Sequence, residues 1–223
     1  MAHYRDGNPD LIQTRLGEFL ADSPLIPVIT LEDPADAVPL ARALVAGGLR
    51  VLEFTLRTSA GAEALKQVRQ AMPEVRLAAG TVRSIEEYHQ AIWAGADFVI
   101  SPGSTSALLD YGVTAEVPLL PGASTVTEIM HGYEKGYRWF KLFPASLSGG
   151  VDAVRAIRGP FPDVQLVPTG GIGADTARDY LIEPGVAAVA GTWLSPDQMI
   201  RERDWKGIER LAAESLGKVS GCR

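Results

Sequence analysis

A single lysine interrupts an apolar run near the middle of the chain. Lys141 lies in the segment Trp139 to Phe143, whose other residues are all aromatic or aliphatic. Such a run predicts a buried strand, and burying an ammonium group is costly unless the group is paired or loses its proton. The neutral amine is a nucleophile that attacks a ketone to form a Schiff base, which helps to make or break the neighbouring C–C bond. The residue type and its apolar setting therefore favour covalent catalysis by Lys141.

A carboxylate occupies the equivalent position of another apolar run. Four segments align on the glycine that ends the preceding helix, and the fifth residues after these glycines are Glu53, Ile100, Lys141 and Ala190. In a barrel of eight parallel strands, alternate strands supply the four side chains of one interior layer. We therefore expect Glu53 to face Lys141 across the barrel axis and to transfer protons during Schiff-base chemistry. A buried ion pair with a purely structural role is the alternative.

The elements that must position these residues form a regular alternation. Eight apolar runs typical of buried strands recur at intervals of roughly 20 to 26 residues, beginning at Leu25, Arg50, Val75, Asp97, Val117, Arg138, Val164 and Val186. The intervening segments have helical spacing, and two contain capping-box patterns, Ser84-x-x-Glu87 and Thr125-x-x-Glu128. Strands that alternate with helices pair in parallel, which predicts an α/β fold of the (β/α)8 TIM barrel type. An open doubly wound sheet is the alternative.

Two further helices are expected at the ends of this alternation. The segment from about Asp10 to Leu20 predicts an extra N-terminal helix that covers the bottom of the barrel, and the segment from about Trp205 to Val219 predicts the eighth barrel helix. A chain of 223 residues that is 46% hydrophobic is long enough for one well-filled core and short for two. We therefore expect residues 1–223 to form a single barrel domain.

Charge and cysteine usage exclude several classes of partner. A net charge of −6 argues against a nucleic-acid or anionic-membrane surface, because these need a basic face. No apolar run reaches the length of a membrane span, and the first ten residues lack the apolar core of a signal peptide, so a cytoplasmic protein is expected. Cys222 is the only cysteine and predicts neither an intrachain disulfide nor a thiolate metal cluster.

Function in this fold lies at the carboxyl ends of the strands. There the chain places Arg57, Thr81, Pro102, Pro121 and Thr169. Arginine can bind a substrate carboxylate with two parallel hydrogen bonds. The turns Pro168 to Ile172 and Ala190 to Trp193 contain glycines and follow the seventh and eighth runs, where barrels often bind phosphate through backbone amides. One glycine turn is more often a plain tight turn, but two at these positions favour a phosphate site.

A metal-dependent aldolase would need histidine and carboxylate ligands at the same strand ends. The three histidines are His3, His89 and His131, which lie in the N-terminal tail and in two helical segments. We therefore expect neither a metal site nor any other cofactor.

Several motifs resemble a known family. "GGLRVLEFTLRT" from Gly47, "AAGTV" from Ala78, "ISPG" from Ile100, "PGASTVTEIM" from Pro121, "KLFPA" from Lys141 and "PTGGI" from Pro168 resemble the 2-keto-3-deoxy-6-phosphogluconate (KDPG) aldolases, class I lyases of the Entner-Doudoroff pathway. The resemblance runs in order from about Pro24 to the C-terminus. It implies cleavage of 2-dehydro-3-deoxy-6-phosphogluconate to pyruvate and glyceraldehyde 3-phosphate, a homotrimer, and some activity on 4-hydroxy-2-oxoglutarate.

The same resemblance assigns roles at the reacting end of the substrate. It implies that Lys141 is the Schiff-base lysine and that Glu53 is the general acid and base. Arg57 and Thr81 would hold the pyruvyl carboxylate.

It also assigns the rest of the substrate site. Pro102 and Phe143 would pack around the pyruvyl end, and Thr169 would contact a substrate hydroxyl. The residues implied to bind the phosphate are Gly170, Gly171, Gly191 and Thr192.

The chain departs from the family pattern at two places. It has Ala190-Gly191-Thr192-Trp193 where many relatives have Gly-Gly-Ser-Trp, and Ser146 where an acidic residue is common. Thr192 keeps the hydroxyl, so phosphate binding is still expected, but the exact substrate stays open.

Other functions fit the same residues less well. An aldolase of this class that prefers the phosphogalactonate epimer or 4-hydroxy-2-oxoglutarate is the nearest alternative, although the polar Thr169 favours the phosphogluconate compound. A phosphate-binding barrel isomerase or synthase would usually need paired carboxylates and a metal, which a lysine opposite a glutamate does not supply. A non-catalytic binding protein would be indicated by loss of Lys141 or Glu53, and both are present.

Overall fold

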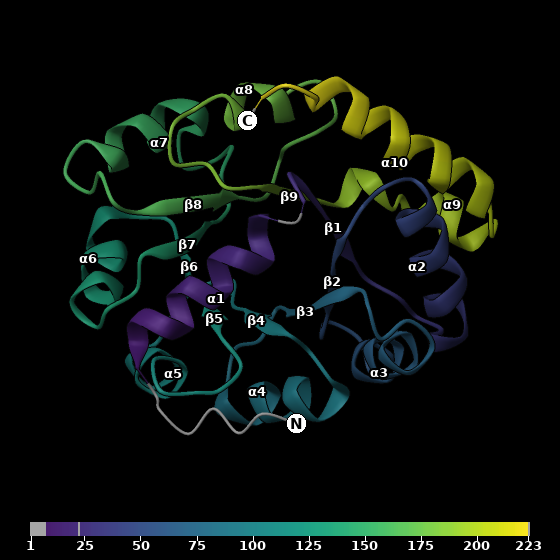
Figure 1. The fold of residues 1–223 in the computed structure, drawn as a ribbon, viewed down its shortest axis with the longest axis horizontal. Coiled ribbons are helices and arrows are strands. Elements are labelled where there is room, and N and C mark those ends of the chain that lie inside the picture. The colour runs from purple at the N-terminus through teal and green to yellow at the C-terminus, as the bar shows by residue number, and fades with distance from the viewer. Residues whose placement is uncertain (1–7, 22, 223) are drawn as a thin grey trace.

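The computed structural model of the protein describes residues 8–21 and 23–222. Its strands lie at the centre of Figure 1, and most of its helices surround them. The strands are β1 Leu25–Ile29, β2 Val51–Thr55, β3 Arg76–Gly80, β4 Phe98–Ile100, β5 Leu119–Leu120, β6 Gly122–Ala123, β7 Trp139–Leu142, β8 Gln165–Pro168 and β9 Val189–Gly191. Each of the eight predicted apolar runs contains at least one of these strands, so the predicted alternation is confirmed.

All the paired strands run in parallel. One sheet has the order β5-β4-β3-β2-β1-β9, and a second has the order β6-β7-β8. The fifth predicted run is divided into β5 and β6 by Pro121, which cannot donate a backbone hydrogen bond to a ladder. Isolated parallel bridges, Leu166↔Val186 and Thr169↔Ala190, link the β8 region to the β9 region. The result is an α/β fold with a curled parallel sheet.

The helices follow the strands in the predicted order. They are α1 Pro9–Ala21, α2 Ala37–Ala46, α3 Gly61–Ala71, α4 Ile85–Ala94, α5 Ser106–Gly112, α6 Val126–Glu134, α7 Gly150–Arg158, α8 Ala177–Leu181, α9 Asp197–Arg201 and α10 Trp205–Val219, with short 3-10 turns η1 Pro34–Asp36 and η2 Thr192–Leu194. The capping box at Thr125 and Glu128 is complete. Ser84 caps α4, whereas Glu87 accepts from the backbone N–H of Arg83. No helix within these ranges is long and apolar enough to cross a membrane.

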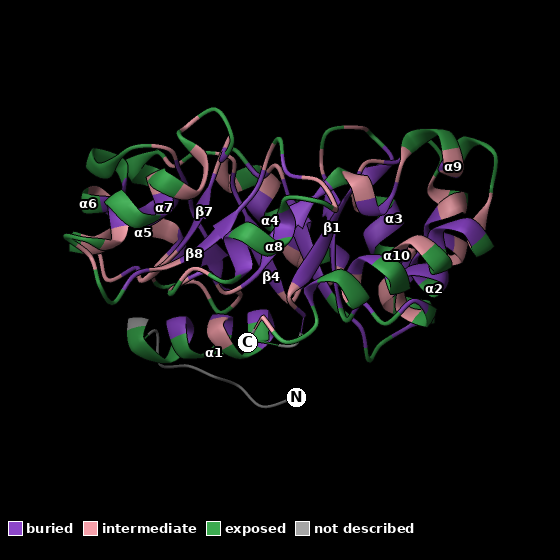
Figure 2. Cartoon of the chain, turned by 90° about the horizontal axis from the view of Figure 1, so that it is seen from above, coloured by how far each residue is buried: buried purple, intermediate pink, exposed green. Residues whose placement is uncertain are grey.

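Helix α1 covers one end of the strands, as predicted for the N-terminal segment. It crosses the centre of the ring of strands in Figure 1 and lies beneath them in Figure 2. Its buried residues Leu16, Phe19 and Leu20 belong to an inner apolar cluster with side chains of the strands, including Phe98 and Val167. A second, larger cluster fills the layer between the strands and the outer helices. The inner cluster closes the amino end of the sheet interior.

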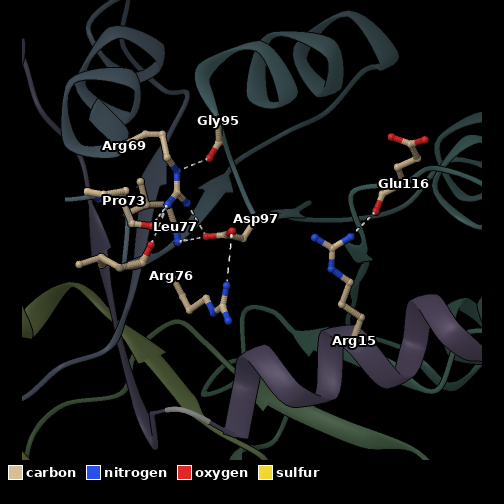
Figure 3. A network of polar contacts seen from close by, with 9 residues as sticks. Arg15, Arg69, Pro73, Arg76, Leu77, Gly95, Asp97 and Glu116 are labelled. Carbon is tan, nitrogen blue, oxygen red and sulfur yellow. Dashed lines mark hydrogen bonds and ion pairs between the residues drawn. The ribbon is translucent and has the colours of Figure 1, made fainter. Parts of the chain in front are cut away.

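A polar network holds the amino ends of β3 and β4 to helix α3 (Figure 3). Asp97, which precedes β4, accepts hydrogen bonds from Arg69 Nη2 at 2.5 Å and from the Leu77 N–H at 2.8 Å. The Arg76 guanidinium lies 3.8 Å from the other carboxylate oxygen. Arg69 also donates to backbone carbonyls, those of Gly95, Pro73 and Val75. This network fixes where α3 ends relative to the two strands.

Candidate active site

The predicted contact between Glu53 and Lys141 is present. Glu53 lies on β2 and Lys141 on β7, and the sequence separation is bridged by a hydrogen bond of 3.0 Å from Lys141 Nζ to Glu53 Oε1. Both residues are buried, with relative exposures of 0% and 4%. Ile100 and Ala190, the other members of the predicted layer, are buried in the inner apolar cluster. The spacing from the preceding glycines therefore identified residues that do lie together inside the sheet.

The hydrogen bonding of this pair is incomplete. Glu53 Oε2 is buried and has no hydrogen-bond partner among the described residues. The Phe143 ring lies over Lys141, with its centroid 5.6 Å from Nζ. One carboxylate oxygen thus accepts a hydrogen bond from the amine, whereas the hydrogen-bonding capacity of the other is unused within the described residues. This arrangement places an amine, a carboxylate and an aromatic ring close together.

Arg57 and Thr81 also meet, at the carboxyl ends of the neighbouring strands β2 and β3. Arg57 Nε donates to Thr81 Oγ1 at 3.1 Å. Thr81 has a φ of 61°, which is a left-handed conformation and uncommon for a β-branched residue. Such strain persists where the surroundings hold it, and it is frequent at functional sites. The pair presents a guanidinium group and a hydroxyl to the same end of the sheet.

Three further predicted residues lie close to the lysine strand. Pro102 follows β4 and is half-buried, and Phe143 follows β7 and is also half-buried. The Phe143–Pro144 peptide bond is cis. Thr169 is buried, with its hydroxyl donating to the Val167 carbonyl at 3.3 Å and its N–H donating to Leu142 at 2.9 Å. These residues surround the carboxyl end of β7 on the side of β4 and on the side of β8.

The two glycine turns differ in why they need glycine. Gly170 and Gly171 have φ values of 97° and 72°, in the left-handed region that favours glycine. Gly191 has an extended φ of −170°, so its backbone could hold any residue. A Cβ atom at Gly191 would lie 1.9 Å from the Trp193 ring. Packing against Trp193 therefore excludes a side chain at Gly191, whereas backbone conformation favours glycine at Gly170 and Gly171.

A cavity of about 620 Å³ opens at the carboxyl ends of the strands. Its lining residues include Thr30, Arg57, Thr192 and Trp193, which come from the carboxyl ends of β1, β2 and β9. Thr192 is exposed. The predicted carboxylate-binding arginine and the predicted phosphate-binding hydroxyl therefore open onto one hollow.

Comparison with known proteins gives a family match. Residues 16–211 match the family model described as KDPG and KHG aldolase. The chain belongs to the KDPG and KHG aldolase family. A curated 2-dehydro-3-deoxy-phosphogluconate aldolase from Pseudomonas aeruginosa is 45% identical over 209 residues, which cover 94% of this chain and 95% of the relative. The predicted family resemblance is thus confirmed.

Two solved structures of KDPG aldolases are similar to this member of the family. One, from Legionella pneumophila with pyruvate captured as a covalent carbinolamine intermediate, has a TM-score of 0.88 and 44% identity, covering 89% of this chain and 97% of that chain. The other, from Zymomonas mobilis ZM4 with 3-phosphoglycerate, has a TM-score of 0.84 and 37% identity, covering 90% of this chain and 96% of that chain. The covalent intermediate fits a lyase of the Schiff-base class.

The two histidines that the structure describes lie on outer helices. His89 is exposed on α4 and contacts the Tyr111 hydroxyl, and His131 is half-buried on α6 and contacts Ser106. His3 lies outside the described residues. Within residues 8–21 and 23–222, no three His, Cys, Asp or Glu side chains are grouped to hold a metal ion.

Ser101 supports the lysine strand and was not predicted from the sequence. The buried Ser101 accepts a hydrogen bond from the Gly122 N–H at 3.1 Å, just after the interruption at Pro121. The Pro121 carbonyl in turn accepts from the Lys141 N–H at 2.9 Å. Ser101 lies within the motif "ISPG", but a serine at a strand end has too many uses for sequence alone to indicate this one.

Proposed function

We propose that this chain is a class I aldolase that cleaves 2-dehydro-3-deoxy-6-phosphogluconate to pyruvate and glyceraldehyde 3-phosphate through a Schiff base on Lys141. The observation that carries the proposal is the buried amine of Lys141, held at 3.0 Å from a carboxylate with an unpaired oxygen. The names of the relatives and the covalent pyruvate intermediate in one of them support the same reaction.

The reaction begins with attack by the neutral Lys141 amine on the C2 ketone. The carbinolamine loses water to form an iminium ion, which is an electron sink. Glu53 removes the proton from the C4 hydroxyl, directly or through water, and the C3–C4 bond breaks with its electron pair moving to C3. The aldehyde leaves, and the enamine accepts a proton at C3. Water then attacks the iminium carbon to release pyruvate and regenerate the amine.

The residues around the pair would orient the pyruvyl end. Arg57 and Thr81 are proposed to bind the carboxylate, because they join a guanidinium group to a hydroxyl beside the buried pair. Pro102 and Phe143 are proposed to form the apolar wall. Thr169 is proposed to bind a substrate hydroxyl, since its own hydroxyl oxygen can still accept a hydrogen bond.

The phosphate would bind where the turns after β8 and β9 meet. Backbone amides at glycine turns favour anions, and the hydroxyl of Thr192 adds a donor. The residues proposed for this part of the site are Gly170, Gly171, Gly191 and Thr192. The structure of the Zymomonas mobilis relative with 3-phosphoglycerate supports a phosphorylated acid as substrate.

We also infer a closed (β/α)8 barrel that forms a single domain over residues 1–223. The chain continues from β5 into β6 through Pro121, and the bridges between the β8 and β9 regions support closure at the other edge. The family resemblance further leads us to propose a homotrimer, a role in the Entner-Doudoroff pathway and a cytoplasmic location. Sedimentation equilibrium should give three times the mass of the chain, and a monomer would contradict the proposed assembly.

Cleavage of 4-hydroxy-2-oxoglutarate is a second candidate activity, because the matching family model covers KHG aldolases as well. A coupled assay of pyruvate release should compare the two phosphorylated epimers and this compound side by side. We expect the phosphogluconate compound to give the highest kcat/KM. A clear preference for either of the other compounds would contradict the assigned substrate.

Borohydride trapping tests the proposed covalent chemistry directly. With pyruvate present, reduction should leave one adduct, on Lys141, and activity should survive strong chelation. An adduct on another lysine would overturn the assignment. Inactivation by a chelator that a divalent metal reverses would indicate a metal-dependent aldolase.

A further inference from the structure

Gly80 is a buried glycine whose backbone does not explain it. It is the last residue of β3 and pairs with Thr55 of β2. Its φ is not among the positive values recorded for other glycines of the chain, so its conformation is open to residues with side chains. Its carbonyl accepts an ordinary hydrogen bond from the Leu56 N–H at 2.8 Å. Some other requirement must therefore exclude a side chain at this position.

The space that a side chain would need is occupied by Glu53. A Cβ atom at Gly80 would lie 2.2 Å from Glu53 Oε1, 2.7 Å from Cγ and 2.8 Å from Cδ. Distances below about 3 Å between such atoms are strongly repulsive, so the carboxylate would have to move. Oε1 is the same oxygen that accepts the hydrogen bond from Lys141 Nζ. A single methyl group at Gly80 would thus displace the atom that orients the lysine.

The Glu53 carboxylate has little room to retreat. Its residue is fully buried, and its register partner across the β2–β3 ladder is the buried Ala78, which belongs to the inner apolar cluster. Protein interiors are packed too closely to absorb such a change without moving their neighbours. A shift of the Glu53 carboxylate would therefore change its distance from Lys141 Nζ.

We propose that Gly80 is a positioning residue, whose missing side chain sets the distance between Glu53 and Lys141. The inference rests on the proposed roles of these two residues. Catalytic groups must be held close to their productive geometry, and a misplacement of about 1 Å can reduce turnover about 100-fold. We expect a loss of this order for Gly80→Ala, caused by the shift of Glu53.

The test is a double-variant cycle in the full chain. Turnover for pyruvate release and the melting temperature should be measured for the wild type, Gly80→Ala, Glu53→Ala and the double variant. Because truncation of Glu53 empties the space beside Gly80, Gly80→Ala should cause no further loss of turnover in that background. Gly80→Ala should lower the melting temperature when Glu53 is present. In the Glu53→Ala background, the same substitution should cause no such decrease.

A matched control separates the effect of a crowded methyl group from the effect on Glu53. Gly112 on α5 has no recorded positive φ, and a Cβ atom there would lie 2.7 Å from the Leu119 side chain. Gly112→Ala should therefore lower the melting temperature while turnover per folded molecule stays near the wild-type value. Its effect should be the same with and without Glu53.

Several results would overturn the inference. These are wild-type turnover in Gly80→Ala, an equal fold-loss in both Glu53 backgrounds, or failure of both Gly80 variants to fold. If Gly80→Ala alone fails to fold and the double variant folds, the conflict with Glu53 is supported. Full activity of Glu53→Ala would instead refute the proposed role of Glu53, and trapping at Lys141 in each variant would show whether the covalent step remains.

Discussion

Two ion pairs lie towards opposite ends of the strands and differ in how completely their atoms are bonded. At the amino ends, Asp97 accepts from Arg69 and from a backbone N–H, and Arg69 donates to three backbone carbonyls (Figure 3). Inside the sheet, the Glu53 carboxylate lies beside Gly80, at the carboxyl end of β3, and shares one hydrogen bond with Lys141. The more deeply buried pair is the one with fewer partners.

Physical chemistry alone would predict the reverse. A buried charged atom without a partner is expensive, so a pair kept for stability should be fully hydrogen-bonded. Asp97 and Arg69 meet that requirement and keep 17% and 23% of their side chains exposed. Glu53 does not meet it, which is the pattern of a site that reserves an oxygen for a ligand. The comparison therefore supports the proposal that the Asp97–Arg69 pair stabilises the fold and that the Glu53–Lys141 pair takes part in the chemistry.

The largest expected effect comes from Glu53→Gln. The amide keeps the shape of the side chain but cannot accept a proton, so turnover should fall by roughly two to four orders of magnitude, the usual range for general acid-base catalysis. Slow trapping of pyruvate on Lys141 should persist, and the circular dichroism spectrum should not change. Near-normal turnover with a large loss of thermal stability would show that this pair is structural, and the contrast between the two pairs would fail.

Asp97→Asn makes the same chemical change at the amino ends. Here the amide loses a charge-assisted bond to Arg69, so we expect the free energy of unfolding to fall by about 1 to 3 kcal/mol. Turnover per folded molecule at 25 °C should stay within about twofold of the wild type, because surface-linked networks far from the reacting atoms leave catalytic geometry intact. Denaturant titration and active-site counting measure the two quantities separately. A selective loss of turnover would be evidence against the division of roles.

Glu128→Gln tests whether the role of a carboxylate depends on its position in the fold or on its hydrogen bonds. Glu128 follows β6 at the carboxyl ends of the strands, yet its Oε2 accepts from the N–H and hydroxyl groups of Ser124 and Thr125. Partial burial acts to raise its pKa, but these hydrogen bonds outweigh burial and hold the pKa below the ordinary value near 4.5. The ionised form is thus favoured by folding, so its stabilisation is present above about pH 4.5 and is lost as the pH falls below it.

The expected loss for Glu128→Gln is small, about 0.3 to 1 kcal/mol at pH 7, as for other charges at helix N-termini. It should shrink as the pH falls through the acid range, because the wild-type carboxyl group then becomes neutral as well. Melting temperatures of both proteins between pH 3 and pH 7 would measure this. A constant difference across that range, or a loss of turnover like that of Glu53→Gln, would contradict the assignment.

The sequence predicts those features of the fold that depend on apolar periodicity, on glycines at helix ends and on capping residues. The glycines before four strands define a common register, and this register predicts that Glu53 and Lys141 lie together. The segment from about Asp10 to Leu20 predicts α1, and capping chemistry predicts the start of α6. These features depend on residues close together in the chain.

The features that could not be predicted depend on contacts between distant segments. Gly80 resembles any strand glycine until the Glu53 carboxylate is seen against it, and the packing of the Trp193 ring against Gly191 has no signal in the sequence either. The left-handed conformation of Thr81 also has no sequence signal, because its residue type disfavours it. Periodicity indicates which face a residue occupies, but not how much room remains on that face.

Helix α1 has a consequence for the order in which substrate and products bind and leave. Its side chains Leu16, Phe19 and Leu20 close the amino end of the interior. In the proposed reaction, substrate and products must therefore use the same opening at the carboxyl ends of the strands. In the proposed reaction the pyruvyl fragment stays tethered to Lys141 after the C3–C4 bond breaks. The aldehyde must therefore leave first. Water then enters through the same opening and hydrolyses the iminium ion, which releases pyruvate. In the synthetic direction the order is reversed, and pyruvate must bind to Lys141 before the aldehyde enters.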